Sequence, residues 1–333
     1  MLFPVASGAG TLRVATYDVE LSRKGPGLML RDILKGDAQV RAIAQVVADT
    51  APDVLFLQGV DYDYRQLGAR ALRDVLADAG IRYPHIFALP QNAGVPSGLD
   101  LNGDGRAHGP ADAQGFGRFR GEGGMVLLSR WPVDAQGVQD FTGLFWRDLP
   151  EARLPKVNGR PFPSPEAQAA QRLSSAGHWM VPVVGPGGQR VTLMLFAAGP
   201  PVFDGPEDRN GLRNADEIRL WQVVLDGALG RPPLGPFVIM GNANLDPDKG
   251  DGRREAIRDL LADSRLQDPH RGMGPTVDWP EPVPGDLRVD YVLPSADLTV
   301  RDAGVMSPGT GSVPGKMVAA ASRHRMVWAD LDF

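Results

Sequence analysis

Residues 52–63 read PDVLFLQGVDYD. Pro52 and Asp53 end the preceding helical stretch, Val54–Leu57 is an apolar run, and mostly polar residues follow. A short, continuous apolar run of this kind is typical of a central strand that is buried on both faces. Outward from it, apolar residues recur at helical spacing over 36–48 and 64–79, and residues 12–19 alternate like a strand. Strands and helices therefore alternate in this part of the chain, which predicts an α/β fold.

The rest of the chain continues the same mixture. Further strands are predicted at 83–88, 125–128, 237–240, 287–293, 298–305 and 325–331, a hairpin at 172–184 and 190–197, helices at 216–229 and 253–262, and long loops at 90–122, 149–168 and 199–214. No repeat or hinge-like linker interrupts this order. We therefore expect a tail at 1–10 and a single domain at 11–333, with mixed sheets covered on the outside by helices.

Composition excludes several classes of function. With 35 Lys and Arg against 40 Asp and Glu, the net charge is −5, so nucleic acid is an unlikely tight partner. The absence of Cys excludes thiol catalysis and Cys-based zinc sites. The longest apolar run, 191–198, is too short to span a membrane, so a soluble protein is expected. The compartment stays open: periplasmic or secreted if a signal peptide was removed, otherwise cytoplasmic. The oligomeric state is equally open.

Six segments carry a family resemblance. In chain order they are LRVATYDVEL (12–21), PDVLFLQGVDYD (52–63), GEGGMVLLSRWPV (121–133), FVIMGNANLDP (237–247), GDLRVDYVLPS (285–295) and ASRHRMVWADL (321–331). Together they resemble a bacterial branch of the endonuclease/exonuclease/phosphatase family, metal-dependent phosphoesterases that include pancreatic deoxyribonuclease. The resemblance implies a four-layer α/β sandwich, in which two packed mixed sheets are flanked by helices and the active site lies at one edge. It also implies a hydrolase that uses Mg²⁺ or Mn²⁺ on a phosphodiester or phosphorylated small molecule.

Most catalytic positions of the family are substituted in this chain. The resemblance places a metal-binding Asn at Asp18 and a metal-binding acid at Gly59, which has no side chain to offer. It places a phosphate-stabilising His at Ala197 and the general-base Asp at Asn242, whose amide takes no proton at neutral pH. These losses predict weak or absent hydrolysis, since a base or a charge-stabilising group contributes about 10²- to 10⁴-fold each.

Three positions of the catalytic set survive. His324 is the remaining phosphate-facing His, or alternatively a satisfied structural one. Asp290 would orient His324, or else pair with Arg288 two residues earlier. Asn244 would bind a phosphate oxygen or water, or else serve the turn that leads to Pro247.

Three arginines are candidate phosphate ligands, because a guanidinium binds phosphate through two parallel hydrogen bonds. Arg209 and Arg213 lie in the predicted loop 199–214, and Arg323 replaces the acid of the closing Ser-Asp-His. The alternative for the first two is pairing with the nearby acids Glu207, Asp208, Asp216 and Glu217.

DLNGDGR (100–106) matches the first half of a calcium-binding loop. Asp100, Asn102 and Asp104 would be the first ligands. The twelfth position is Ala111, where a bidentate acid belongs, so a plain acidic turn is the alternative to Ca²⁺ binding in the 100–112 loop.

Two functions fit these residues. In the first, the protein is a degenerate enzyme that keeps the phosphoesterase scaffold and binds a phosphorylated small molecule or a partner. In the second, it is an active divalent-metal-dependent phosphodiesterase or phosphatase with a rebuilt site. That site would use Asp18, Asn244, Asp290 and His324, with a nearby loop acid as the missing ligand. The substitutions favour the first.

Overall fold

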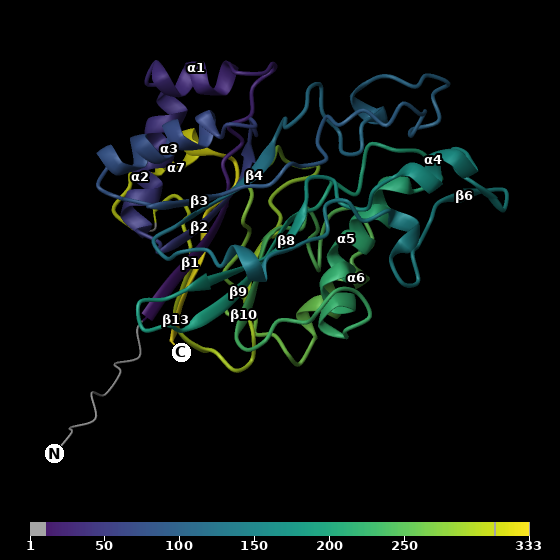
Figure 1. The fold of residues 1–333 in the computed structure, drawn as a ribbon. Coiled ribbons are helices and arrows are strands. Elements are labelled where there is room, and N and C mark those ends of the chain that lie inside the picture. Colours follow the sequence, from purple (N-terminus) through teal and green to yellow (C-terminus); the bar gives the residue numbers. More distant parts are fainter. Residues whose placement is uncertain (1–10, 310, 333) are drawn as a thin grey trace.

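Two mixed β-sheets form the centre of the computed structural model, which describes residues 11–309 and 311–332 (Figure 1). The first sheet has the strand order β12-β13-β1-β2-β4-β3, and the second has β11-β10-β9-β8-β5. The strands of the first sheet are β1 (Thr11–Asp18), β2 (Val54–Val60), β3 (His85–Phe87), β4 (Gly124–Ser129), β12 (Thr299–Val305) and β13 (Val327–Asp332). Those of the second are β5 (Gln139–Asp140), β8 (His178–Val184), β9 (Arg190–Ala197), β10 (Phe237–Asn242) and β11 (Asp290–Pro294), and β6 (Lys156–Val157) pairs with β7 (Arg160–Pro161) in a small ribbon.

Helices cover the outer face of each sheet (Figure 1). Beside the first sheet lie α1 (Leu28–Leu34), α2 (Ala38–Thr50), α3 (Leu67–Asp78) and α7 (Gly315–Ala321); beside the second lie α5 (Arg209–Leu225) and α6 (Glu255–Leu261), and α4 (Pro165–Ala170) lies in a long loop. The start of α2 is fixed locally, because the Asp37 side chain accepts hydrogen bonds from the amides of Gln39 and Val40. The predicted α/β sandwich of two packed mixed sheets flanked by helices is confirmed.

The apolar residues form two main clusters that match these layers. One cluster contains side chains of both sheets together with α2, α3 and α7, so it fills the space between the sheets and under the first set of helices. The other joins the outer face of the second sheet to α5 and α6. Strand β1 contacts both β10 and β11 across the interface. Consequently, residues at the ends of β1 and β10 come together although more than 200 positions separate them.

The sequence-based prediction misplaced the start of one helix and missed three short α-helices. Helix α5 begins at Arg209 rather than at 216, so Arg209 and Arg213 lie on a helix and not in a loop. The short helices α1, α4 and α7 had no counterpart in the prediction. Helices of six or seven residues give too few apolar repeats to reveal a period.

The predicted tail at 1–10 lies outside the described residues. Within the described residues, no helix is both long enough and apolar enough to cross a membrane.

Candidate functional site

One cavity of about 710 Å³ collects most of the predicted site residues. Asp18 ends β1, Gly59 lies in β2, Ala197 ends β9, Asn242 ends β10, and Asn244 follows two residues later. All five line the cavity. Their convergence follows from topology, because β1 and β2 are parallel, β9 and β10 are parallel, and the two sheets pack together.

At the floor of the cavity, Asp18 and Asn242 are hydrogen-bonded to each other. The Asn242 Nδ2 group donates to Asp18 Oδ2 at 3.1 Å, and Asn242 Oδ1 accepts from the Asn244 amide at 2.7 Å. The other Asp18 oxygen, Oδ1, accepts from the Glu20 amide at 3.1 Å. Both Asp18 oxygens therefore already have internal donors.

A catalytic divalent cation does not fit these residues. Mg²⁺ and Ca²⁺ are held by several oxygen ligands, usually including carboxylates. Here Gly59 offers none, and Asn242 turns an N–H toward the Asp18 carboxylate where a cation would need an oxygen. Among the described residues, no group of three or more His, Cys, Asp or Glu side chains is placed to hold a metal ion.

Gly59 is also required by the backbone. Its φ is +68°, in the left-handed region, and the pairing of β2 with β4 shifts register there. A Cβ at this position would lie 2.5 Å from Asp18 Oδ1 and 2.8 Å from the Glu20 nitrogen. A side chain at position 59 therefore conflicts with the present position of Asp18.

We expect Gly59→Ala to destabilise the protein by more than Gly80→Ala. Both glycines have positive φ, which costs a non-glycine residue about 1–3 kcal/mol, but a Cβ at Gly80 meets nothing within 4 Å. Urea unfolding of the two variants isolates the clash with Asp18. Equal losses would show that the Asp18 side chain moves aside freely.

The surviving Asp and His form a buried pair, as predicted. Asp290 Oδ2 accepts a hydrogen bond from His324 Nδ1 at 2.8 Å and another from the Thr276 hydroxyl at 2.9 Å. Asp290 is fully buried, its Oδ1 atom has no hydrogen-bond partner in the described part of the chain, and the Trp279 ring meets His324 edge-on at 5.7 Å. The alternative Arg288–Asp290 pair does not form, since Arg288 pairs with Asp268.

This pair determines the charge at the site. Burial alone would lower the pKa of His324, but the carboxylates of Asp290 and Asp18 and the Nδ1 hydrogen bond raise it to about 9. His324 is therefore an imidazolium at neutral pH. It lies beneath the cavity surface, only 3% exposed, and supplies positive charge next to Asp18.

Asn244 lies in the turn after β10 and also lines the cavity. Its φ is +50°, which suits a turn residue of this type, and its Nδ2 group donates to the Ala198 carbonyl at 2.8 Å. The side chain thus fixes the end of β9 beside Ala197 while lining the cavity.

The three candidate arginines have different surroundings. Arg323 is ion-paired with Glu20. Arg213 is buried and donates four hydrogen bonds to the carbonyls of Gln114, Arg172, Leu173 and Ser174, so it ties loops together. Arg209 lines the cavity and, among the described residues, has no carboxylate within 4.0 Å.

Sequence reasoning missed a buried acid in the cavity wall. Glu217 accepts hydrogen bonds from the amides of Ser175 (2.5 Å) and Gly199 (2.8 Å) and from the Ser175 hydroxyl (3.2 Å). Burial raises the pKa of Glu217 to about 7, against the opposing effects of Arg213 and these hydrogen bonds. A helical Glu carries no sequence signal for such a role, because its neighbours come from distant loops.

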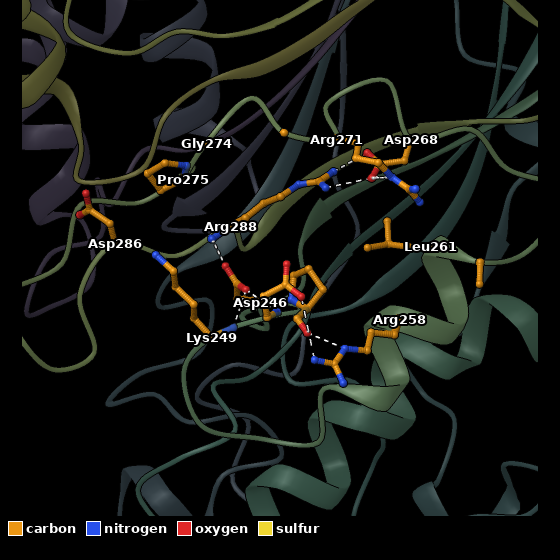
Figure 2. Close-up of a pocket in the computed structure, with 14 residues that line it drawn as sticks. Asp246, Lys249, Arg258, Leu261, Asp268, Arg271, Gly274, Pro275, Asp286 and Arg288 are labelled. Carbon is orange, nitrogen blue, oxygen red and sulfur yellow. Dashed lines mark hydrogen bonds and ion pairs between the residues drawn. The ribbon is translucent and has the colours of Figure 1, made fainter.

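A second cavity, of about 490 Å³, lies beyond β10 and contains balanced charge. Its lining has four cations and four acids: Lys249, Arg258, Arg271 and Arg288, and Asp246, Asp248, Asp268 and Asp286. Figure 2 shows Arg288 and Arg271 turned toward Asp268 on one wall. Asp246 accepts from the backbone amides of Asp248, Lys249 and Arg288. Asp268 is thus paired with two arginines, and Asp246 is satisfied by backbone amides.

The candidate calcium loop folds around its own backbone. Asp100 accepts from the amides of Gly103 (2.6 Å) and Gly105 (2.8 Å), and the Asn102 amide group donates to Asp104 at 3.2 Å. Ca²⁺ binding in the 100–112 loop stays a prediction.

Comparison with known protein families shows the family to which this chain belongs. The model of the endonuclease/exonuclease/phosphatase family matches residues 15–324, which include both ends of the site, from Asp18 to His324. The chain belongs to the endonuclease/exonuclease/phosphatase family. No curated protein sequence matches it.

Solved structures of this family share the fold. A family protein from Beutenbergia cavernae superposes with a TM-score of 0.59 at 22% identity, over 97% of this chain and 72% of that one. Sphingomyelinase C from Streptomyces griseocarneus gives 0.55 at 20% identity, over 96% and 99%. A mannosyl-6-phosphatase from Bacteroides thetaiotaomicron gives 0.50 at 15%, over 97% and 100%. At these identities the likeness shows the fold of an endonuclease/exonuclease/phosphatase-family protein. It does not identify the substrate, which has to be inferred from the site residues.

Proposed function

We propose that this endonuclease/exonuclease/phosphatase-family protein binds a phosphorylated small molecule in its cavity and hydrolyses it little or not at all. The observation that carries the proposal is the Asn242–Asp18 hydrogen bond, 3.1 Å long, at the position where the family resemblance places the general base and the metal ligand. An amide that donates to the only carboxylate of this pair neither deprotonates water nor leaves room for a cation.

Two further features support a binding role. The scaffold of the family is retained over 15–324, and the cavity volume of about 710 Å³ falls in the range of small-molecule sites, roughly 300–1,000 Å³. The phosphoesterase relatives generally depend on divalent metals, and the present residues do not fit one. The chain therefore retains the capacity to bind a ligand and has lost most of the capacity for catalysis.

The alternative is an active phosphoesterase with a rebuilt site. Two observations favour it. The Asp290–His324 pair is intact, and four carboxylates besides Asp18 line the cavity, namely Glu122, Asp204, Glu207 and Glu217. Each of those four accepts hydrogen bonds from the protein or pairs with a cation, which lowers its availability as a ligand.

Hydrolysis assays separate the two functions. We expect no turnover of 4-nitrophenyl phosphate or bis(4-nitrophenyl) phosphate, with Mg²⁺, Mn²⁺ or Ca²⁺, above that of the triple variant D18A/D290A/H324A. Binding of inorganic phosphate, followed by calorimetry, is expected in the wild type. Metal-dependent turnover that disappears in the triple variant would establish the rebuilt enzyme instead, and circular dichroism must show that both proteins are folded.

A further inference from the structure

The wall of the cavity also contains Arg209, which is buried and has no ion-pair partner within residues 11–309 and 311–332. Arg209 is 7% exposed, and its two hydrogen bonds go to the amide oxygens of Gln171 (3.3 Å) and Asn210 (3.4 Å). Burial, together with Arg213, lowers the pKa of Arg209 to about 10, so the guanidinium is still charged at neutral pH. A buried charge is costly unless it is paired, and here the nearest free space is the cavity.

Two phenylalanines line the same cavity, and both side chains are largely exposed to solvent. Phe203 is 89% exposed and Phe116 is 66% exposed, and both line the cavity from different loops. Phe203 also has φ at +71°, a conformation that costs a bulky residue about 1–3 kcal/mol and that clusters at ligand sites. The Asn210 amide donates to Asp204 at 2.5 Å, which holds the residue after Phe203 beside the residue after Arg209.

Nearby carboxylates limit the charge that this part of the cavity can accept. Asp204 accepts from the Asn210 amide at 2.5 Å, and Glu207 accepts from the Gly205 amide at 3.1 Å. Both lie close enough to act on Arg209 electrostatically. A dianion would gain from one guanidinium and be repelled by two carboxylates, whereas a monoanion meets less repulsion.

We infer that Arg209, Phe116 and Phe203 form a ligand subsite, separate from the Asp18–Asn242 pair, that binds a singly charged anion carrying a planar aromatic group. The guanidinium pairs with the anion, and the phenyl rings cover the planar group. The inference deepens the proposed function and rests on it for one point, that the natural ligand contains phosphorus. An aryl phosphodiester has both the single charge and the ring. The cavity volume of about 710 Å³ accommodates one such ligand.

Calorimetry at pH 8 tests the subsite with four probes: bis(4-nitrophenyl) phosphate, 4-nitrobenzenesulfonate, 4-nitrophenyl phosphate and inorganic phosphate. The first two are monoanions with a ring, the third is a dianion with a ring, and the fourth has no ring. We expect the two monoanions to bind at least 5-fold more tightly than the dianion. Phe203→Ala and Phe116→Ala should each weaken the monoanions by about 2- to 10-fold and leave inorganic phosphate unchanged.

Arg209→Gln should weaken both monoanions by about 10-fold or more, because a charge-assisted hydrogen bond is lost. Arg301→Gln and Leu234→Ala are the matched controls, since Arg301 is already paired with Asp332, Leu234 is 93% exposed, and both lie outside the cavity. Neither should alter binding. If Arg209→Gln unfolds, the two exposed Phe positions still decide the result.

The outcomes separate this inference from the proposed function. Sulfonate binding that depends on Phe203 and Phe116 supports the subsite even if no phosphoester binds. Equal affinity for all four probes, or monoanion binding unchanged in both Phe variants, overturns the subsite while phosphate binding upholds the proposed function. Failure of every probe to bind overturns both.

Discussion

Asn242→Asp is expected to give the protein a divalent-cation site. The new carboxylate would keep the hydrogen bond from the Asn244 amide through one oxygen, and its second oxygen would replace Nδ2, which lies 3.1 Å from Asp18 Oδ2. Two carboxylates at this separation repel each other unless one binds a proton or both bind a cation. Mn²⁺ calorimetry and the rise of Tm with Mn²⁺ concentration measure the gain.

Hydrolysis should follow the metal in this variant. A restored base and cation are each worth roughly 10²-fold or more, so we expect Mn²⁺-dependent cleavage of bis(4-nitrophenyl) phosphate by N242D, and a further rise in N242D/A197H. Restoring an acid at Gly59 should not help, because its left-handed backbone and the Asp18 contact resist a side chain.

The double variant D18N/N242D is the matched control. It exchanges the amide and the carboxylate, removes the repulsion and leaves one charge at the same place, so it should bind no Mn²⁺. A folded N242D protein that binds Mn²⁺ no better than the wild type would contradict this account of the site.

Asp290→Asn is expected to destabilise the protein by about 3–5 kcal/mol at pH 7, because removal of one partner leaves the other buried charge uncompensated. The pKa of His324, about 9 in the wild type, should fall, since burial then opposes the charge with less compensation. NMR titration of the imidazoles measures it. His270 is an internal reference: burial lowers its pKa, and its Nε2 atom bonds to the Trp328 carbonyl rather than to an acid.

The pH dependence has a definite sign. A folded-state pKa raised from 6.5 to about 9 stabilises the protein fully below pH 6.5, and that stabilisation is lost as the pH rises to about 9. The loss corresponds to about 3 kcal/mol. Urea unfolding across pH 6–9.5 should show this fall in the wild type and a flatter profile in D290N. A His324 that still titrates near pH 9 in D290N would mean that Asp18, not Asp290, holds the charge.

Local patterns in the chain were enough for the elements that carry the site. Apolar runs and turn residues predicted β2, β4, β10 and the β8–β9 hairpin, because a buried strand needs such a run whatever surrounds it. Motif order then placed Asp290 beside His324, and the 2.8 Å hydrogen bond bears this out.

The tertiary structure alone decided what each side chain can do. Sequence grouped Arg209, Arg213 and Arg323 together. In the structure, Arg209 and Arg213 both line the cavity, but Arg213 is held by loop carbonyls and Arg323 pairs with Glu20. Their partners lie up to 303 positions away, as for Arg323 and Glu20, and no local pattern encodes such a distance. Gly59 likewise reads as a lost ligand in the sequence, and only its φ and its contact with Asp18 show that the backbone requires it. The sequence by itself determined the main strands and their order along the chain. Packing of the two sheets determined which charges meet, because burial and counter-ions exist only once distant segments are in contact.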